Sequence, residues 1–245
     1  MTRLTRLLAA GLLLLLVAPP AAAQENVPAD QAEFEARIRA YLMEHPEVIV
    51  EALQELERRQ QAATQAKQKQ AISDFRDELT GQAGDPVAGN PAGAVTVVEF
   101  FDYRCPYCKA VAQDMIDTLT AEGDVRIVFK EFPILGPQSE QAARAALAAR
   151  LQDKYLPFHQ ALMAHKGELD EAALFGIAEE VGLDVARLRT DMDSAEIDET
   201  ISRNIKLANT LAIGGTPAFV VGETLVPGAL DMDTLRKLVA EAREG

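Results

Sequence analysis

Cysteine is scarce in this chain, with only two among 245 residues, so no framework of disulfides can hold its core. The three histidines are scattered and none lies near the cysteines in sequence, so a tetrahedral zinc site would lack ligands. Basic residues number 24 against 38 acidic ones, and the net charge of −14 argues against nucleic acid or anionic lipid as a partner. Because neither a disulfide framework nor a zinc site is available, the packing of side chains must hold the fold.

Long apolar runs are also absent, except for one at the N-terminus. Arg3 and Arg6 precede an apolar stretch from Leu7 to Ala18, and the small residues of positions 21–23 follow it. A bilayer span needs about 20 apolar residues, so we interpret residues 1–23 as a cleavable signal peptide and not as a membrane anchor. The sequence thus predicts a soluble, exported, periplasmic protein, in a compartment where disulfides persist.

The two cysteines form the motif C-P-Y-C, from Cys105 to Cys108. A β-favouring apolar run precedes it and an apolar-periodic segment follows, which predicts a strand, a turn and a helix beginning at Pro106. The positive end of a helix favours a thiolate placed there. A thiolate is the reacting species in disulfide exchange, and a cysteine one turn later can resolve the mixed disulfide. We therefore interpret Cys105 as the nucleophile and Cys108 as the resolving thiol of a redox-active disulfide.

Other interpretations of this pair are weaker or remain open. A structural bridge between residues three apart closes a very short loop and stabilises little. A two-thiolate Cu(I) site is harder to exclude, because soft sulfur ligands suit that ion. A copper-binding or copper-transfer protein using the same thiols is thus the alternative from another class. We predict no resident metal or cofactor.

Two segments of the sequence resemble those of a known family. The segment F-F-D-Y-R-C-P-Y-C-K (residues 100–109) is similar to the active-site segment of DsbA-family thiol–disulfide oxidoreductases, and G-G-T-P-A-F-V-V (residues 214–221) to their cis-proline loop. The resemblance covers roughly residues 94–245. It implies an α/β thioredoxin fold with an inserted α-helical subdomain, and a cis peptide bond before Pro217, which would face Cys105. It also implies cysteine-containing client proteins and a membrane redox partner that resets the active site.

Several neighbours of the thiols are predicted to bind clients or tune the chemistry. Pro106 and Tyr107 lie between the cysteines, and Tyr107 is expected to tune redox poise and to contact the client. Thr216 and Pro217 open an apolar strand, one place where a sheet tolerates proline. The backbone there can pair with an extended client segment.

Glu99 lies in an apolar strand and is expected to be buried beneath the active site. A buried carboxyl tends to a raised pKa and could exchange a proton with Cys108; DsbA relatives carry an acidic residue at this place. Lys130, on the next strand, is a candidate neighbour, and a solvated edge position is the alternative. His159 and His165 are interpreted as ordinary surface or partly packed residues.

Residues 24–80 are predicted to form a helical oligomerisation segment and spacer, separate from a domain at residues 81–245. Within this segment the helix is expected to break at His45-Pro46. The turn formers of residues 81–93 mark the boundary between the segment and the domain. The segment carries an apolar stripe, here called the N-terminal stripe: Phe34, Ile38, Leu42, Val48, Ile49, Leu53 and Leu56. Such a stripe packs on the domain or on copies of itself. The polar helical spacer of residues 57–70 favours self-association.

The same segment is similar to the N-terminal region of ScsC-type DsbA-like proteins, which implies a homo-oligomer, a dimer or a trimer. Within the domain we expect a second strand at Val125–Phe132 parallel to the first, and a helical insertion over about 138–211 that begins with Ser139 as an N-cap. A strand at Ala218–Val221, its hairpin partner, and a last helix capped by Asp231 complete the chain.

The predicted function is therefore that of an exported protein thiol–disulfide oxidoreductase working by two successive thiolate exchanges. The oligomerisation segment favours an isomerase or reductase, because isomerases benefit from several active sites facing a shared cleft. A DsbA-type disulfide oxidase is the alternative, and the C-P-Y-C motif does not decide between them.

Overall fold

The computed structural model describes residues 29–82 and 84–244. The chain divides into two compact units, the first ending at Arg58 and the second beginning at Arg59. The predicted signal peptide at residues 1–23 lies outside the described residues. Within the described ranges, no helix is long and apolar enough to cross a membrane.

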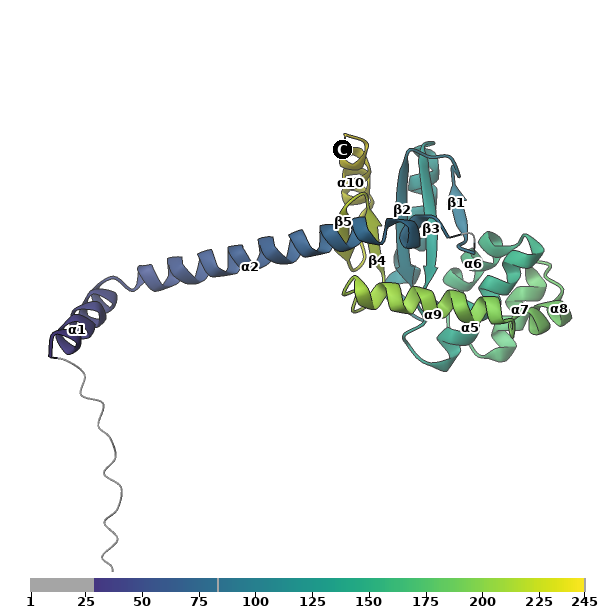
Figure 1. Cartoon of the computed structure of the whole chain (residues 1–245). Coiled ribbons are helices and arrows are strands. Elements are labelled where there is room, and N and C mark those ends of the chain that lie inside the picture. The colour runs from purple at the N-terminus through teal and green to yellow at the C-terminus, as the bar shows by residue number, and fades with distance from the viewer. Residues whose placement is uncertain (1–28, 83, 245) are drawn as a thin grey trace, which may run out of the picture. The chain divides into compact units, whose positions relative to one another are not determined.

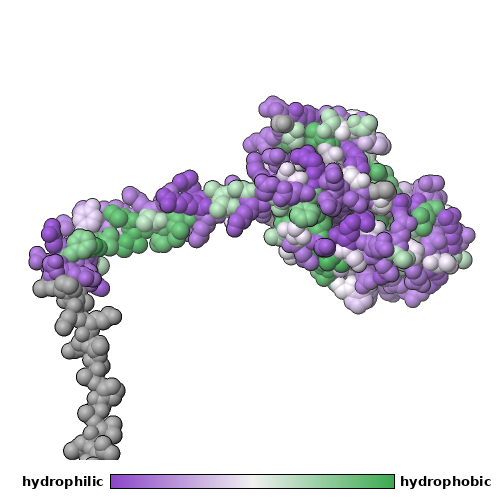
Figure 2. Space-filling model, in the orientation of Figure 1, coloured by the Kyte–Doolittle hydropathy of each residue, from purple (hydrophilic) through white to green (hydrophobic). Residues whose placement is uncertain are grey.

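The first unit consists of α1 (Ala29–Glu44) and the first part of α2 (Glu47–Asp74), with the break at His45-Pro46 as predicted. Most of its large apolar side chains are exposed in the single chain, among them Phe34 at 62 % and Leu53 at 55 %. Figure 2 shows hydrophobic residues gathered along these two helices. The N-terminal stripe therefore has an apolar surface that this unit does not itself bury.

The second unit is built on a five-stranded sheet of order β1-β3-β2-β4-β5 (Figure 1). The strands are β1 (Val87–Gly89), β2 (Val95–Phe101), β3 (Val125–Glu131), β4 (Ala218–Val221) and β5 (Thr224–Pro227). As predicted, β2 and β3 are parallel and joined through α4 (Pro106–Ala121), and β4 and β5 form a hairpin. Strand β1 was not predicted. Its three residues are too few to show an alternating pattern amid turn formers.

Side chains of β2 alternate between two cores, as a strand requires. Val97 and Phe101 lie on the face that also receives buried residues of α4 and α10 (Met232–Glu244). Val98 and Phe100 lie on the other face. Ile72 of α2 and Leu79 of α3 (Arg76–Thr80) complete this second core, together with the C-terminal end of α9 (Ala195–Thr210).

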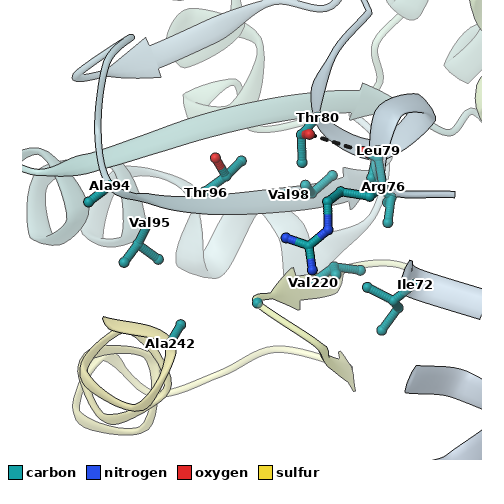
Figure 3. Close-up of a pocket in the computed structure, with 11 residues that line it drawn as sticks. Ile72, Arg76, Leu79, Thr80, Ala94, Val95, Thr96, Val98, Val220 and Ala242 are labelled. Atoms are coloured by element: carbon teal, nitrogen blue, oxygen red, sulfur yellow. Dashed lines mark hydrogen bonds between the residues drawn. The ribbon is translucent and has the colours of Figure 1, made fainter. Parts of the chain in front are cut away.

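Packing of the second unit thus begins before residue 81, where the turn formers predicted a domain boundary. Ile72 is 2 % exposed and Leu79 1 %. A pocket of about 170 Å³ lies beside them, also lined by β2, β4 and α10. In Figure 3 the Arg76 side chain extends from α3 into this pocket, towards Val220. Neither cysteine lines it, so this hollow is separate from the thiol chemistry.

The predicted helical insertion lies between β3 and β4. It comprises α5 (Pro137–Ala149), a 3₁₀ turn (Arg150–Gln152), α6 (Tyr155–Ala164), α7 (Glu171–Glu180), α8 (Val185–Asp191) and α9. The predicted N-cap at Ser139 is wrong. The cap is Gly136, whose φ of 109° suits glycine, and Pro137 occupies the first turn. The predicted cap of α10 is confirmed, since Asp231 Oδ1 accepts the N–H of Thr234 at 2.8 Å.

Candidate active site

The two thiols lie at the start of α4. Cys105 is the N-cap, Pro106 follows in the first turn, and neither cysteine is in a disulfide. The backbone N–H of Cys108 donates to Cys105 Sγ at 3.4 Å. Cys105 is 4 % exposed and Cys108 is fully buried. The Cys105 sulfur therefore faces the unpaired N–H groups of the helix, where negative charge is stabilised.

The loop before β4 meets the thiols from a distant part of the sequence. The Thr216-Pro217 bond is cis. The thiol of Cys105 donates to the carbonyl oxygen of Thr216 at 3.2 Å, a contact between residues 111 apart. The structure thus brings together Cys105, Pro106, Thr216 and Pro217 of the predicted site. Tyr107 is 66 % exposed and lies on its outer surface.

Glu99 is buried beneath this site, as expected, at 0 % exposure. Neither carboxylate oxygen has a hydrogen-bond partner in the described part of the chain. Burial raises the pKa of Glu99 to about 8. Burial also raises the pKa of the Cys108 thiol, and the charge on Glu99 raises it further. Two buried acids therefore lie within electrostatic reach of each other.

Lys130 is not the neighbour of Glu99. In the parallel register Lys130 lies opposite Phe100 and Glu99 lies opposite Phe129, so their side chains are on opposite faces of the sheet. Lys130 instead forms a buried ion pair with Asp85 and donates to the carbonyl of Glu78 at 2.7 Å. Once the register is known, the alternation of side chains along the two strands excludes a contact between Glu99 and Lys130.

Replacing Glu99 by glutamine is expected to flatten the dependence of the free energy of unfolding on pH. The folded carboxyl holds its proton up to about pH 8, against an ordinary value of 4.5. Its contribution to stability is therefore fully present below pH 4.5 and is lost as the pH rises through about 8, by up to about 1.4 kcal/mol per pH unit. Urea unfolding between about pH 5 and 8 measures this. The exposed Glu179→Gln serves as the control, and parallel curves for wild type and Glu99→Gln would contradict the expectation.

Asp102 is a site residue that sequence reasoning missed. Its buried carboxylate accepts the backbone N–H groups of Arg104 at 2.7 Å, Ile134 at 2.9 Å and Leu135 at 3.0 Å, and the hydroxyl of Ser139 at 2.8 Å. It thus joins the turn before Cys105 to the loop after β3. An aspartate bonding the N–H two residues on is a known turn signal, and it was available in D-Y-R.

A second missed feature is a buried polar cluster on the thiol side of the sheet, and it corrects the interpretation of His159. Tyr103 and Tyr155 each donate a hydroxyl hydrogen bond to Glu131 Oε1, at 3.0 and 2.9 Å. His159 Nδ1 lies 3.0 Å from the Tyr103 hydroxyl, and His159 is fully buried. Burial raises the pKa of Glu131 and lowers that of His159 to about 3. His165 is partly packed, as expected.

These features define a class of protein. A dithiol at a helix N-terminus, a cis-proline whose preceding carbonyl meets the outer thiol, and a buried acid beneath them are the features of a thiol–disulfide oxidoreductase built on a thioredoxin fold.

Comparison with known families agrees with this class. Residues 96–240 match the family described as DSBA-like thioredoxin domain, and residues 30–63 match the family described as Copper resistance protein ScsC N-terminal domain. The chain therefore belongs to the DsbA-like thioredoxin family, with an ScsC-type N-terminal segment. The predicted fold and family resemblance are confirmed.

Solved structures show the same fold. A thioredoxin-like oxidoreductase from Silicibacter pomeroyi is 47 % identical, with a TM-score of 0.68, over 69 % of this chain and 98 % of that one. A linker-deleted Proteus mirabilis ScsC is 30 % identical, with a TM-score of 0.69, over 90 % of this chain and 98 % of that one.

Among curated relatives, the Na⁺/H⁺ antiporter NhaA 1 of Salinispora arenicola is 33 % identical over 163 residues, which are 66 % of this chain. The chain spans only about a quarter of the length of that relative, of which 25 % is aligned. The antiporter's activity does not follow from a match of this extent.

Proposed function

We propose that the protein exchanges disulfides with exported client proteins in the periplasm, as an isomerase or reductase. The observation that supports this most directly is the environment of the Cys105 sulfur. It lies between the N–H of Cys108 and the carbonyl of Thr216, while Cys108 is buried behind it. We infer that the Cys105 sulfur, at the helix N-terminus, reacts with the client and that Cys108 reacts only with Cys105.

The proposed cycle consists of two exchanges. The Cys105 thiolate attacks one sulfur of a client disulfide, a new S–S bond forms, and the client's other sulfur leaves as a thiolate. Rearrangement within the client then completes isomerisation, or attack by Cys108 on Cys105 releases the reduced client. A membrane redox partner would return the oxidised pair to the dithiol.

Glu99 is proposed to accept the proton of Cys108 in the resolving step. Because burial disfavours the Cys108 thiolate, attack by this sulfur needs a nearby acceptor. With a pKa of about 8, Glu99 can gain and lose a proton near neutral pH. Its role is then that of a buried proton carrier for the second exchange.

The client is proposed to lie across the cis-proline loop. The backbone of Thr216 and Pro217 is next to the Cys105 sulfur, and an extended client segment can pair with it as an added strand. Tyr107, exposed between the cysteines, would contact the same client.

We also propose self-association through the N-terminal stripe, which would favour the isomerase assignment. Most of the stripe is exposed in the single chain, and it belongs to the segment that matches the ScsC N-terminal family. Burying each such side chain contributes roughly 1.5–3 kcal/mol, and the ordering costs of association offset much of this. A dimer or trimer would give several active sites to one client.

Refolding of scrambled ribonuclease tests this function. Ile49→Asp together with Leu53→Asp should give a monomer by light scattering, with scrambled-ribonuclease activity lost and exchange with small dithiols kept. The matched control adds the same charge to the polar part of α2, as Gln61→Asp with Thr64→Asp, and should keep both assembly and activity. A wild type that oxidises reduced ribonuclease but cannot rescue the scrambled form is an oxidase, and a monomeric wild type has no shared cleft.

Copper binding is a second candidate, favoured by two adjacent unbonded thiols. Soft thiolates suit Cu(I), and no group of three or more potential ligands occurs among the described residues to suit another ion. Copper stoichiometry of the reduced protein under anaerobic conditions distinguishes this role from disulfide exchange.

A further inference from the structure

A pocket of about 470 Å³ lies beside the reactive motif. One wall is the turn before Cys105 and the start of α4, including Arg104, Pro106 and Lys109. The other wall is residues 165–169, the loop between α6 and α7. Because Pro106 is bonded to Cys105, the pocket borders the path by which a client reaches the outer thiol.

The walls of this pocket are cationic, although the chain as a whole is acidic. Three cations, Arg104, Lys109 and Lys166, line it against the single carboxylate of Glu168, whereas the net charge of the chain is −14. Glu168 accepts a hydrogen bond from Gln138 at 3.0 Å. The local charge is thus opposite in sign to that of the whole molecule.

Two of these cations are available to a ligand. Lys109 is partly buried, and its Nζ donates to the carbonyls of Leu162 at 3.1 Å and His165 at 2.7 Å, so it mainly closes the end of α6. Arg104 and Lys166 are exposed, and neither forms an ion pair with any described residue. Arg104 uses one Nη to bond the carbonyl of Leu135, which positions the guanidinium at the rim.

We propose that this pocket binds acidic residues flanking the client's cysteine, so that the protein prefers disulfides in anionic segments. The inference rests on the proposed disulfide exchange and names its substrate class. A chain advances about 3.3 Å per extended residue, and Pro106, the residue bonded to Cys105, lines the pocket, so residues near the reacting cysteine are the ones to meet its walls. Arginine pairs well with carboxylates. Repulsion from the distant acidic surface is screened beyond about 8–10 Å, so the local cations decide.

Three cysteine peptides, each joined to thiopyridine by a disulfide, test the proposal on the reduced full-length protein. Their flanking residues are aspartate, serine or lysine. The Cys105 thiolate attacks the peptide sulfur, forming a mixed disulfide, and the thiopyridine sulfur leaves with the electron pair of the broken bond and takes a proton from solvent. Absorbance of the released thiopyridone gives the rate. We expect the aspartate peptide to react roughly tenfold faster than the lysine peptide at an ionic strength of about 0.1 M, where the distant acidic surface is screened. The ratio should shrink at about 1 M salt, where the local cations are screened as well.

Charge-matched variants locate the effect. Arg104→Gln with Lys166→Gln should bring the aspartate-to-lysine ratio close to one. Lys166→Gln alone should lower it partway. Arg236→Gln with Lys237→Gln removes the same charge from exposed positions of α10, outside the pocket, and should keep the wild-type ratio.

Each other outcome overturns the inference. If the lysine peptide reacts faster with wild type, the overall negative charge governs recognition. If both double variants change the ratio equally, the effect belongs to total charge and not to the pocket. Reaction of the serine peptide with no preference for aspartate defeats only the charge selectivity, whereas no reaction with any peptide defeats the proposed function as well.

Discussion

Cys108→Ala is expected to turn the protein into a trap that stops after a single exchange and accumulates mixed disulfides with its clients. The attacking sulfur of Cys105 remains at the N-terminus of α4, next to Thr216, while the buried sulfur that would release the client is gone. Cys105→Ser should reduce exchange to the uncatalysed rate, because the remaining thiol is fully buried and burial raises its pKa. Non-reducing electrophoresis of extracts detects the trapped complexes.

Controls make the assignment of the two sulfurs specific. A Cys105→Ser, Cys108→Ala double variant should trap nothing. In the wild type, iodoacetamide at mildly acidic pH should label Cys105 before Cys108. Trapped complexes in Cys105→Ser, or earlier labelling of Cys108, would show that the roles are reversed.

Truncation at residue 81 is expected to destabilise the catalytic unit by about 5 kcal/mol or more, whereas truncation at residue 59 should leave it folded and able to exchange with small dithiols. The longer deletion removes Ile72 and Leu79, which are buried against the sheet (Figure 3). Losing a large buried side chain costs about 2–5 kcal/mol. It also removes the carbonyls of Glu78 and Thr80, which accept hydrogen bonds from Lys130 and Arg126 at 2.7 and 2.6 Å. Against typical stabilities of about 5–15 kcal/mol, such a fragment is marginal.

Two leucines provide a matched control for this expectation. Leu79→Ala should lower the free energy of unfolding by about 2–5 kcal/mol, because this side chain is 1 % exposed. Leu56→Ala, at a side chain 50 % exposed in the N-terminal stripe, should change the stability of the catalytic unit little. Urea unfolding of the two fragments and two variants measures all four values. Equal stability of the fragments would restore residue 81 as the boundary.

Features set by local sequence could be predicted. The apolar, β-favouring run of β2, the proline after Cys105 and the C-x-x-C spacing each act within one turn or strand, so they identified the strand, the helix and the thiols without tertiary information. The same holds for the Asp231 cap. The placement of Pro217 required the family resemblance, because a cis bond has no local signature.

Features that depend on pairing could not be predicted. Whether Lys130 or Phe129 faces Glu99 depends on a register that single strands do not reveal. The burial of His159 depends on aromatic rings from β2, β3 and α6, which meet only in the folded chain. The spacer of residues 57–70 is polar to its end, and nothing in it indicates that Ile72, two residues later, is buried against the sheet.

The shared carboxylate of Glu131 has a mechanical consequence. It receives one tyrosine hydroxyl from the turn before the thiols, Tyr103, and another from the helical insertion, Tyr155. If the insertion moved away from the sheet, the Glu131 carboxyl and the two tyrosine hydroxyls would lose their hydrogen-bond partners. The free-energy cost would be about 1–3 kcal/mol for each group left unpaired. These hydrogen bonds therefore hold the insertion against the catalytic turn, which argues against a role for the insertion as a hinged lid. Accommodation of clients of different shape has to come from the exposed rim, where Tyr107, Arg104 and Lys166 can change rotamer.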